Sequence, residues 1–156
     1  MFEPGSVGEY RGVVSAPSVS RAAGVSLTIV TVATAATAFG YVRLLADQGD
    51  WPRLDPRQFF VLVFLIGLAV TGGIGTVAHS VLTRAAAAAA CSVGLLALGL
   101  LALFSIGLVL IIAGVVAAYA WLMAAVQDRT GASRLASAIA ASATIAVLII
   151  GLLLTG

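Results

Sequence analysis

The stretch AAAAAACSVGLLALGLLALFSIGLVLIIAGVVAAYAWLMAAVQ, residues 85–127, contains no Asp, Glu, Lys, Arg or His. As one straight helix it would be about 65 Å long, at ~1.5 Å per residue. The hydrocarbon core of a bilayer is only about 30 Å thick, so a single helix would extend an apolar surface into water. The stretch therefore predicts a hairpin of two membrane-spanning helices, residues 85–104 and 106–126, with a turn near Ser105 and Gly107.

The composition of the whole chain also indicates a membrane protein. Of its 156 residues, 62% are hydrophobic and 9% are charged, whereas about 25% of the residues of a soluble domain are charged. A water-soluble fold is therefore excluded. The eight cations are all arginines, which together with abundant Ala, Val and Gly indicates a GC-rich prokaryotic source. Because these arginines form no clustered basic face, the chain is not expected to bind nucleic acid.

Three further apolar segments accompany the hairpin, at residues 22–42, 57–82 and 134–154. Each is long enough to cross the hydrocarbon core as a helix. The sequence therefore predicts an all-α, polytopic bundle of five transmembrane helices. This bundle forms a single domain, residues 21–156, after a flexible N-terminal tail, residues 1–20.

Local signals mark where some of these helices begin. Asp55 followed by Pro56 predicts the N-cap and the first position of the second helix, where the missing N–H of proline is not needed. Thr83 and Arg84 form the predicted connection to the third helix, and Ser133 is the predicted cap of the last one.

Two alternatives to this topology stay open. If residues 85–127 form one continuous helix, the chain has four spans and every residue after them changes side. Separately, Ala36, Thr37 and Ala38 resemble the cleavage site of a secretory signal peptide, which would remove residues 1–38. The tail before that site is long and only weakly basic, which favours an uncleaved first helix.

The arginines bear on the orientation, because cytoplasmic loops are enriched in Lys and Arg. With five spans and a cytoplasmic N-terminus, five arginines are cytoplasmic and three are external; four spans with an external N-terminus give the same split. The length of the uncharged stretch therefore decides between the two topologies. We expect a multi-pass protein of the cell membrane, with its N-terminus cytoplasmic and its C-terminus external.

Small residues recur every four positions in three of the predicted spans, and residues at this spacing share one helix face. They let helix backbones approach closely, which drives helix association in lipid. The contact could lie within the chain or with a second subunit, either a membrane-protein partner or another copy. The predicted helix-packing interface consists of Gly67, Thr71, Gly75, His79, Ala90, Gly94, Ser137 and Ala141.

Two residues could carry chemistry inside the membrane. His79, the one histidine, lies near the predicted cytoplasmic end of the second helix, and an ionisable residue in a membrane helix is a functional candidate. Cys91, the one cysteine, lies at a comparable depth in the third helix, so a Cys–His pair is conceivable. These two side chains do not supply the ligands of a metal or haem site. No metal and no cofactor is therefore expected, and His79 is the one candidate ligand for a cofactor.

The threonines of the first span, at residues 28, 31, 34 and 37, resemble a polar stripe. Each three-residue step falls about 60° short of a full turn, so these side chains spread around the helix. We expect their hydroxyls to bond back to the backbone of their own helix.

Three functions fit this sequence, which contains no nucleophile elbow, phosphate loop or metalloprotease signature. The first is a non-catalytic accessory or assembly subunit that packs against a larger membrane complex or against itself. The second is a small oligomeric transporter or channel with a mid-membrane cavity lined by the first-span threonines, Thr71 and Ser92. The third is a membrane redox or lipid enzyme that uses His79 with Cys91.

Overall fold

The computed structural model describes residues 16–49, 55–102, 107–127 and 131–155. These residues form five α-helices: α1 Ala16–Asp47, α2 Pro56–Val77, α3 Val81–Leu101, α4 Gly107–Gln127 and α5 Ala132–Thr155. Each helix contains a segment long and apolar enough to cross a membrane. The predicted five-helix membrane bundle is therefore confirmed. The predicted tail, residues 1–20, lies outside the described residues up to residue 15.

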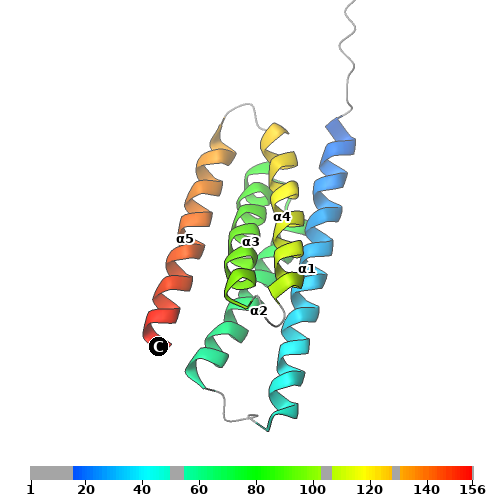
Figure 1. The fold of residues 1–156 in the computed structure, drawn as a ribbon. Helices are drawn as coiled ribbons and strands as arrows, with labels where there is room; N and C mark the ends of the chain where they lie inside the picture. The colour runs from blue at the N-terminus through cyan, green and yellow to red at the C-terminus, as the bar shows by residue number, and fades with distance from the viewer. Residues whose placement is uncertain (1–15, 50–54, 103–106, 128–130, 156) are drawn as a thin grey trace, which may run out of the picture.

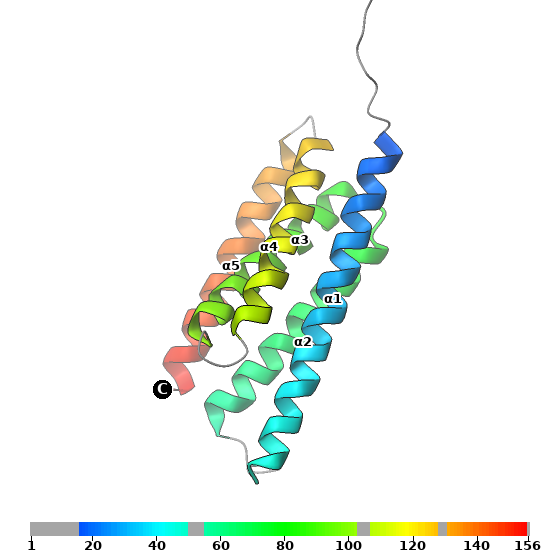
Figure 2. The same ribbon diagram turned by 45° about the vertical axis from the view of Figure 1, so that its right-hand side comes forward.

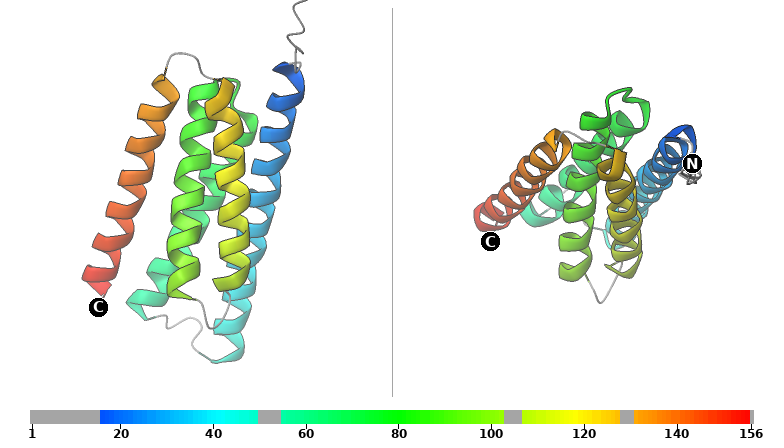
Figure 3. Two further views of the ribbon diagram at one scale, coloured as in Figure 1. Left: turned by 45° about the horizontal axis from the view of Figure 1, so that its top comes forward. Right: turned by 90° about the horizontal axis from the view of Figure 1, so that it is seen from above.

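The helices form a ring of four with a fifth attached to its outside. Helix α1 packs against α2 and α4, and α3 packs against the same two helices (Figures 1 and 2). Helix α5 packs mainly on α3, so α1 and α5 lie on opposite sides of the bundle (Figure 3). Consequently α3 is the central helix, with neighbours on three sides.

The uncharged stretch does not form one continuous helix. Helix α3 ends at Leu101 and α4 begins at Gly107, whose backbone N–H donates to the carbonyl of Ala102 at 2.8 Å. The predicted turning point at Ser105 lies outside the described residues. The hairpin, and with it the odd number of spans in the described chain, follows directly from the length of the stretch.

The first helix is longer than the sequence predicts. The predicted span, residues 22–42, lies between Arg21 and Arg43, but α1 runs from Ala16 to Asp47 and is followed by Gly49 at φ +80°. Arginine is a good helix former, and its long side chain can reach the headgroups from within a helix. An arginine therefore marks the membrane surface without ending the helix.

The connection between α2 and α3 also differs from the prediction. Pro56 begins α2 as expected, after Asp55, whose backbone N–H donates to Oε1 of Gln58 at 3.0 Å. However, α2 ends at Val77 and not at Leu82, and α3 begins at Val81 with Ser80 as its N-cap. Glycines near the end of α2 weaken its last turns, and a serine cap favours a new start. Thr83 and Arg84 therefore belong to the first turn of α3.

The two ends of the bundle are tied by arginines that donate to helix C-terminal carbonyls, where the helix dipole favours a cation. Arg84 donates from Nη2 to the carbonyl of Ala78, just past α2, at 2.8 Å. Arg57, at the start of α2, donates from Nε to the carbonyl of Thr155 in α5 at 3.2 Å. These bonds join helices that are otherwise held by apolar contacts.

The interior of the bundle is apolar and its outer surface is apolar as well. The core is filled by side chains such as Val30, Leu65, Leu95 and Leu110. Large aliphatic side chains are exposed on all five described helices, as lipid contact requires and water does not permit. This distribution places the outer face of the bundle against the bilayer.

Close helix contacts depend on small residues of α2 and α3. A Cβ added to Gly75 would lie 2.8 Å from Cβ of Ala87 and 3.3 Å from Cδ1 of Leu27, so three helices meet there. A Cβ on Gly94 would lie 2.8 Å from Cδ2 of Leu68 and 3.2 Å from Cγ2 of Thr144. Glycine allows α3 to approach α2 and α5 at this level.

Replacing Gly75 with valine should destabilise the bundle by about 1–3 kcal/mol, because Ala87 has no flexible atoms that could move aside. We expect a lower midpoint of thermal unfolding in detergent, which size-exclusion chromatography of heated samples would measure. Gly67→Val is the matched control, since a Cβ at Gly67 meets no atom within 4 Å. Equal losses in the two variants would contradict the packing described for Gly75.

The start of α1 and the end of α5 lie at opposite ends of the bundle (Figure 1). If the arginine distribution sets the orientation, an alkaline phosphatase fused after Gly156 should be active and a green fluorescent protein fused there should be dark. Fusions made after His79, in the connection between α2 and α3 at the opposite end of the bundle from the C-terminus, should give the opposite result. Fluorescence from the C-terminal fusion would show that the orientation is the opposite of the one expected.

Candidate functional site

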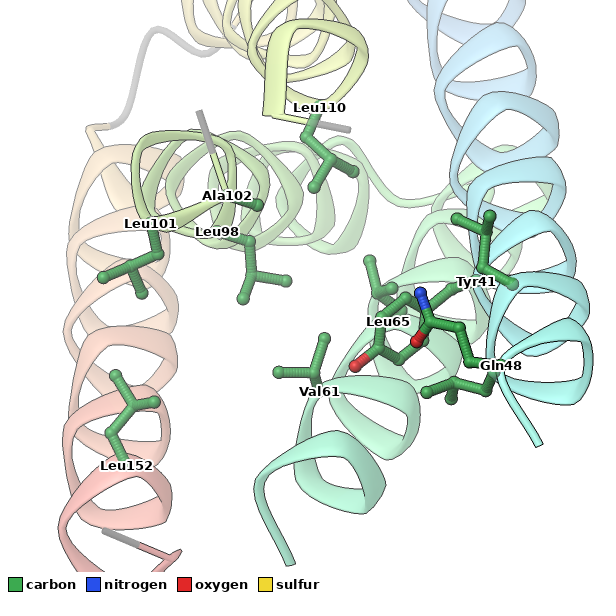
Figure 4. A pocket seen from close by; sticks show the side chains of 11 residues that line it. Tyr41, Gln48, Val61, Leu65, Leu98, Leu101, Ala102, Leu110 and Leu152 are labelled. Carbon is green, nitrogen blue, oxygen red and sulfur yellow. The ribbon is translucent and has the colours of Figure 1, made fainter. Parts of the chain in front are cut away.

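A cavity of about 400 Å³ lies at the end of the bundle where α1, α3 and α5 end and α2 and α4 begin. All five helices contribute to its wall. Leucines make most of this wall, including Leu65, Leu98, Leu101, Leu110 and Leu152 (Figure 4). Its volume falls within the range of small-molecule pockets, about 300–1,000 Å³.

Two side chains supply the polar groups of this cavity, Tyr41 of α1 and Gln48 in the turn directly after α1. Both extend toward the space beside Leu65 (Figure 4). The backbone N–H of Gln48 still donates to the carbonyl of Leu44 at 3.0 Å, so the spacing of seven residues places Gln48 on the same side as Tyr41. The cavity can accept an apolar group with one hydrogen-bonding end, and the described residues of its wall include no carboxylate, imidazole or thiol.

The sequence does not predict this cavity, because the predicted first span ends at residue 42, before Gln48. The helical spacing of Tyr41, Leu45 and Gln48 is the signal that could have extended the helix. The closure of the cavity by α3, α4 and α5 depends on tertiary packing and left no local signal.

The predicted packing residues of α2 have different surroundings. Gly75 is buried against α1 and α3, whereas Gly67 is exposed and has open space where a Cβ would be. Thr71 is half-buried and donates its hydroxyl to the carbonyl of Gly67 at 2.8 Å. His79 lies outside the helix, in the exposed connection to α3. The four residues therefore do not share one contact, since steps of four drift by about 40° each.

The predicted packing residues of α3 and α5 lie where those two helices meet. Ala90 and Gly94 of α3 are buried, and so is Ser137 of α5, while Ala141 is half-buried. Gly94 faces Thr144 of α5. These small residues are used inside the chain.

His79 and Cys91 are not brought together. Cys91 is 0% exposed and donates its S–H to the carbonyl of Leu68 at 3.4 Å. It lies ten residues into α3, about 15 Å from the helix start beside which His79 is found. The sequence predicts a comparable depth for His79 and Cys91 only because the predicted second helix is longer than α2. Among the described residues, no cluster of three His, Cys, Asp or Glu side chains could hold a metal ion.

The threonines of α1 behave as predicted. Thr28, Thr31, Thr34 and Thr37 each donate their hydroxyl to the carbonyl four residues earlier, at 2.8–3.0 Å. The hydroxyls expected to share one cavity are also dispersed. Thr37 lines a groove beside α4, Thr71 a groove between α2 and α5, and Ser92 a groove between α3, α4 and α5.

The architecture defines the class: the chain is a polytopic membrane protein built as a five-helix bundle within the described residues. Comparison with known proteins found no matching family model, no similar curated protein and no similar solved structure. Its function must therefore be inferred from its own surfaces.

Cys91 should not react with maleimides while the bundle is folded, because its thiol is buried between α2 and α3. We expect labelling by N-ethylmaleimide only after denaturation in SDS, measured as a mass shift. A His79→Cys, Cys91→Ala variant is the control, since position 79 is exposed and should label in the folded protein. Rapid labelling of native Cys91 would reveal a water-filled route that this packing does not provide.

Proposed function

We propose that this protein is a non-catalytic accessory or assembly subunit that receives a transmembrane helix of another subunit between α2 and α5. The α2–α5 groove has a volume of about 330 Å³. It is lined by small or short side chains, namely Gly67, Thr71, Ala90, Ala143 and Thr144, and by larger apolar ones, namely Phe60, Val63, Phe64, Leu68 and Val147.

The observation that carries this proposal is the difference between two glycines of α2. The space beside Gly75 is occupied by Leu27 and Ala87 of the same chain, whereas nothing lies within 4 Å of a Cβ at Gly67. A glycine on a membrane helix weakens that helix by about 1 kcal/mol relative to alanine. Its advantage is close approach by another helix. Gly75 shows this advantage inside the chain, and Gly67 offers it to a partner.

The chemistry of the groove specifies the partner surface. The groove is lined by apolar side chains and two threonines, so it suits an apolar transmembrane helix with a branched aliphatic residue opposite Gly67. The partner is a larger membrane complex or a second copy of this chain. In the membrane of the cell, with the N-terminus cytoplasmic, the groove faces the lipid, where such a helix can reach it.

The other two hypotheses receive less support from the arrangement of side chains. Transport through a mid-membrane cavity needs the threonine and serine hydroxyls to converge, and they line separate grooves. Catalysis by His79 with Cys91 needs those side chains to meet, and one is exposed at the end of the bundle while the other is buried within it.

Gly67→Leu should abolish partner binding while leaving the bundle folded. Leucine fills the groove, and its higher helix propensity offsets any loss in α2. The protein would be extracted in mild detergent and studied by native mass spectrometry with identification of the co-eluting chains. Gly24→Leu is the matched control, because Gly24 also has open space at its Cβ but lies on α1, away from the groove.

Self-association can be separated from binding to another protein by cysteine cross-linking. A Val63→Cys, Cys91→Ala variant should form a disulfide-linked dimer in membranes only if the partner is a second copy. A wild-type protein that migrates as a lone monomer under all mild conditions would refute the proposal. So would a Gly67→Leu variant that keeps every partner of the wild type.

A further inference from the structure

A second groove lies on the other side of α5 and differs from the first in having polar atoms without partners. Two adjoining hollows, of about 310 and 350 Å³, share Trp121 of α4 and Arg134 of α5. Helix α5 packs mainly on α3 and only slightly on α4, and the hollow lies between α4 and α5. We call this hollow the α4–α5 groove.

Two buried donors in the α4–α5 groove lack acceptors among the residues that the structure describes. Ser137 is only 3% exposed, and neither its Oγ nor the buried indole Nε1 of Trp121 has a hydrogen-bond partner there. Both side chains line the hollow of about 310 Å³. Buried polar atoms are nearly always paired in folded proteins. A ligand with oxygen acceptors in the groove would offer these donors the partners that they lack.

The missing bond of Ser137 is not a general property of hydroxyls in this chain. Thr144 of the same helix donates to the carbonyl of Ala140 at 2.8 Å, and the threonines of α1 make the same kind of bond. The hydroxyl of Ser137 therefore differs from these threonine hydroxyls in having no hydrogen-bond partner among the described residues.

A cation lies at the mouth of the groove. Arg134 is exposed, lines both hollows and belongs to the first turn of α5, where the helix dipole also favours an anion. Along α5, Arg134 lies about 3 Å from the helix start and Ser137 about 8 Å. The cation is thus nearer to the membrane surface than the two neutral donors. Beyond them, the wall is mainly apolar, with residues such as Val93, Ala118 and Ala141 beside Ser92.

We infer that the α4–α5 groove binds one anionic phospholipid, with its phosphate at Arg134, an ester carbonyl at Ser137 and Trp121, and an acyl chain along α3. The order of cation, neutral donors and apolar wall matches the order of phosphate, glycerol esters and hydrocarbon in such a lipid. This site is distinct from the α2–α5 groove and does not depend on the function proposed for it.

The inference can be tested with the fluorescence of Trp121. The chain contains two tryptophans, so Trp51→Phe leaves Trp121 as the sole one. The full-length protein would be placed in phosphatidylcholine vesicles. One of two lipids with brominated acyl chains, phosphatidylglycerol or phosphatidylcholine, would then be added in rising fractions. Brominated phosphatidylglycerol should quench Trp121 at about a fivefold lower mole fraction, as one cation–anion contact at a membrane surface predicts.

Two substitutions separate the charge from the neutral donors. Arg134→Gln should remove the preference for phosphatidylglycerol, and Arg43→Gln, at the other end of the bundle, should not. Ser137→Ala should weaken quenching by both lipids about fivefold, because their ester carbonyls are the same, while Ser142→Ala on the exposed face of α5 should not. Circular dichroism and thermal unfolding would verify that each variant is folded.

Equal quenching by the two brominated lipids in the wild type would overturn the inference, as would an unchanged preference in Arg134→Gln. If inorganic phosphate relieved the quenching, the ligand of Arg134 would be a soluble phosphate, and the inference of a lipid site would also be overturned. Loss of the preference in Arg134→Gln, without an effect of inorganic phosphate, would establish the lipid.

Discussion

Close packing of small side chains around α3 is the constraint on which the rest of the bundle depends. Lipid removes the hydrophobic advantage of helix association, so helices in a membrane are held by contacts at short range. The alanine tract at the start of α3 is buried, and Ala85, Ala88 and Cys91 are fully enclosed. Larger side chains there would move α2, α4 and α5 apart and would open the core at Leu65 and Leu95.

The same constraint explains why α5 creates two grooves. A helix that packs on one central neighbour can touch it along only one face, and α5 uses its serine- and alanine-containing face for α3. The space on either side of that contact is then left to a ligand or a partner. On one side the groove exposes a glycine, and on the other it is lined by two buried donors, without partners among the described residues, beside an arginine. These contents suggest a helix for the first groove and a lipid for the second.

Polar groups inside the span are satisfied by different means, and the difference has functional value. The threonines of α1 use the carbonyls of their own helix, and Cys91 uses the carbonyl of Leu68 in α2. These bonds neutralise hydroxyls and a thiol that might otherwise form a polar path. Ser137 and Trp121 stand apart because they have donors and no acceptor, which is why the second groove, and not the threonine-rich helix, carries the inference of a ligand.

The sequence by itself determined the membrane class, the five helices and the hairpin of α3 and α4, because hydropathy and segment length act locally. It also predicted the start of α2 at Pro56 and the backbone bonding of the threonines, since caps and hydroxyl bonds depend on residues within one turn. The sequence did not predict that α1 extends beyond its flanking arginines or that α2 ends soon after its glycines. The second of these differences placed His79 too close to Cys91. Only the tertiary structure decided that Gly75 is filled and Gly67 is open, because that depends on where neighbouring helices cross. The tertiary structure likewise brought Trp121, Arg134 and Ser137 to one groove, because α5 rests on α3 and leaves α4 uncovered.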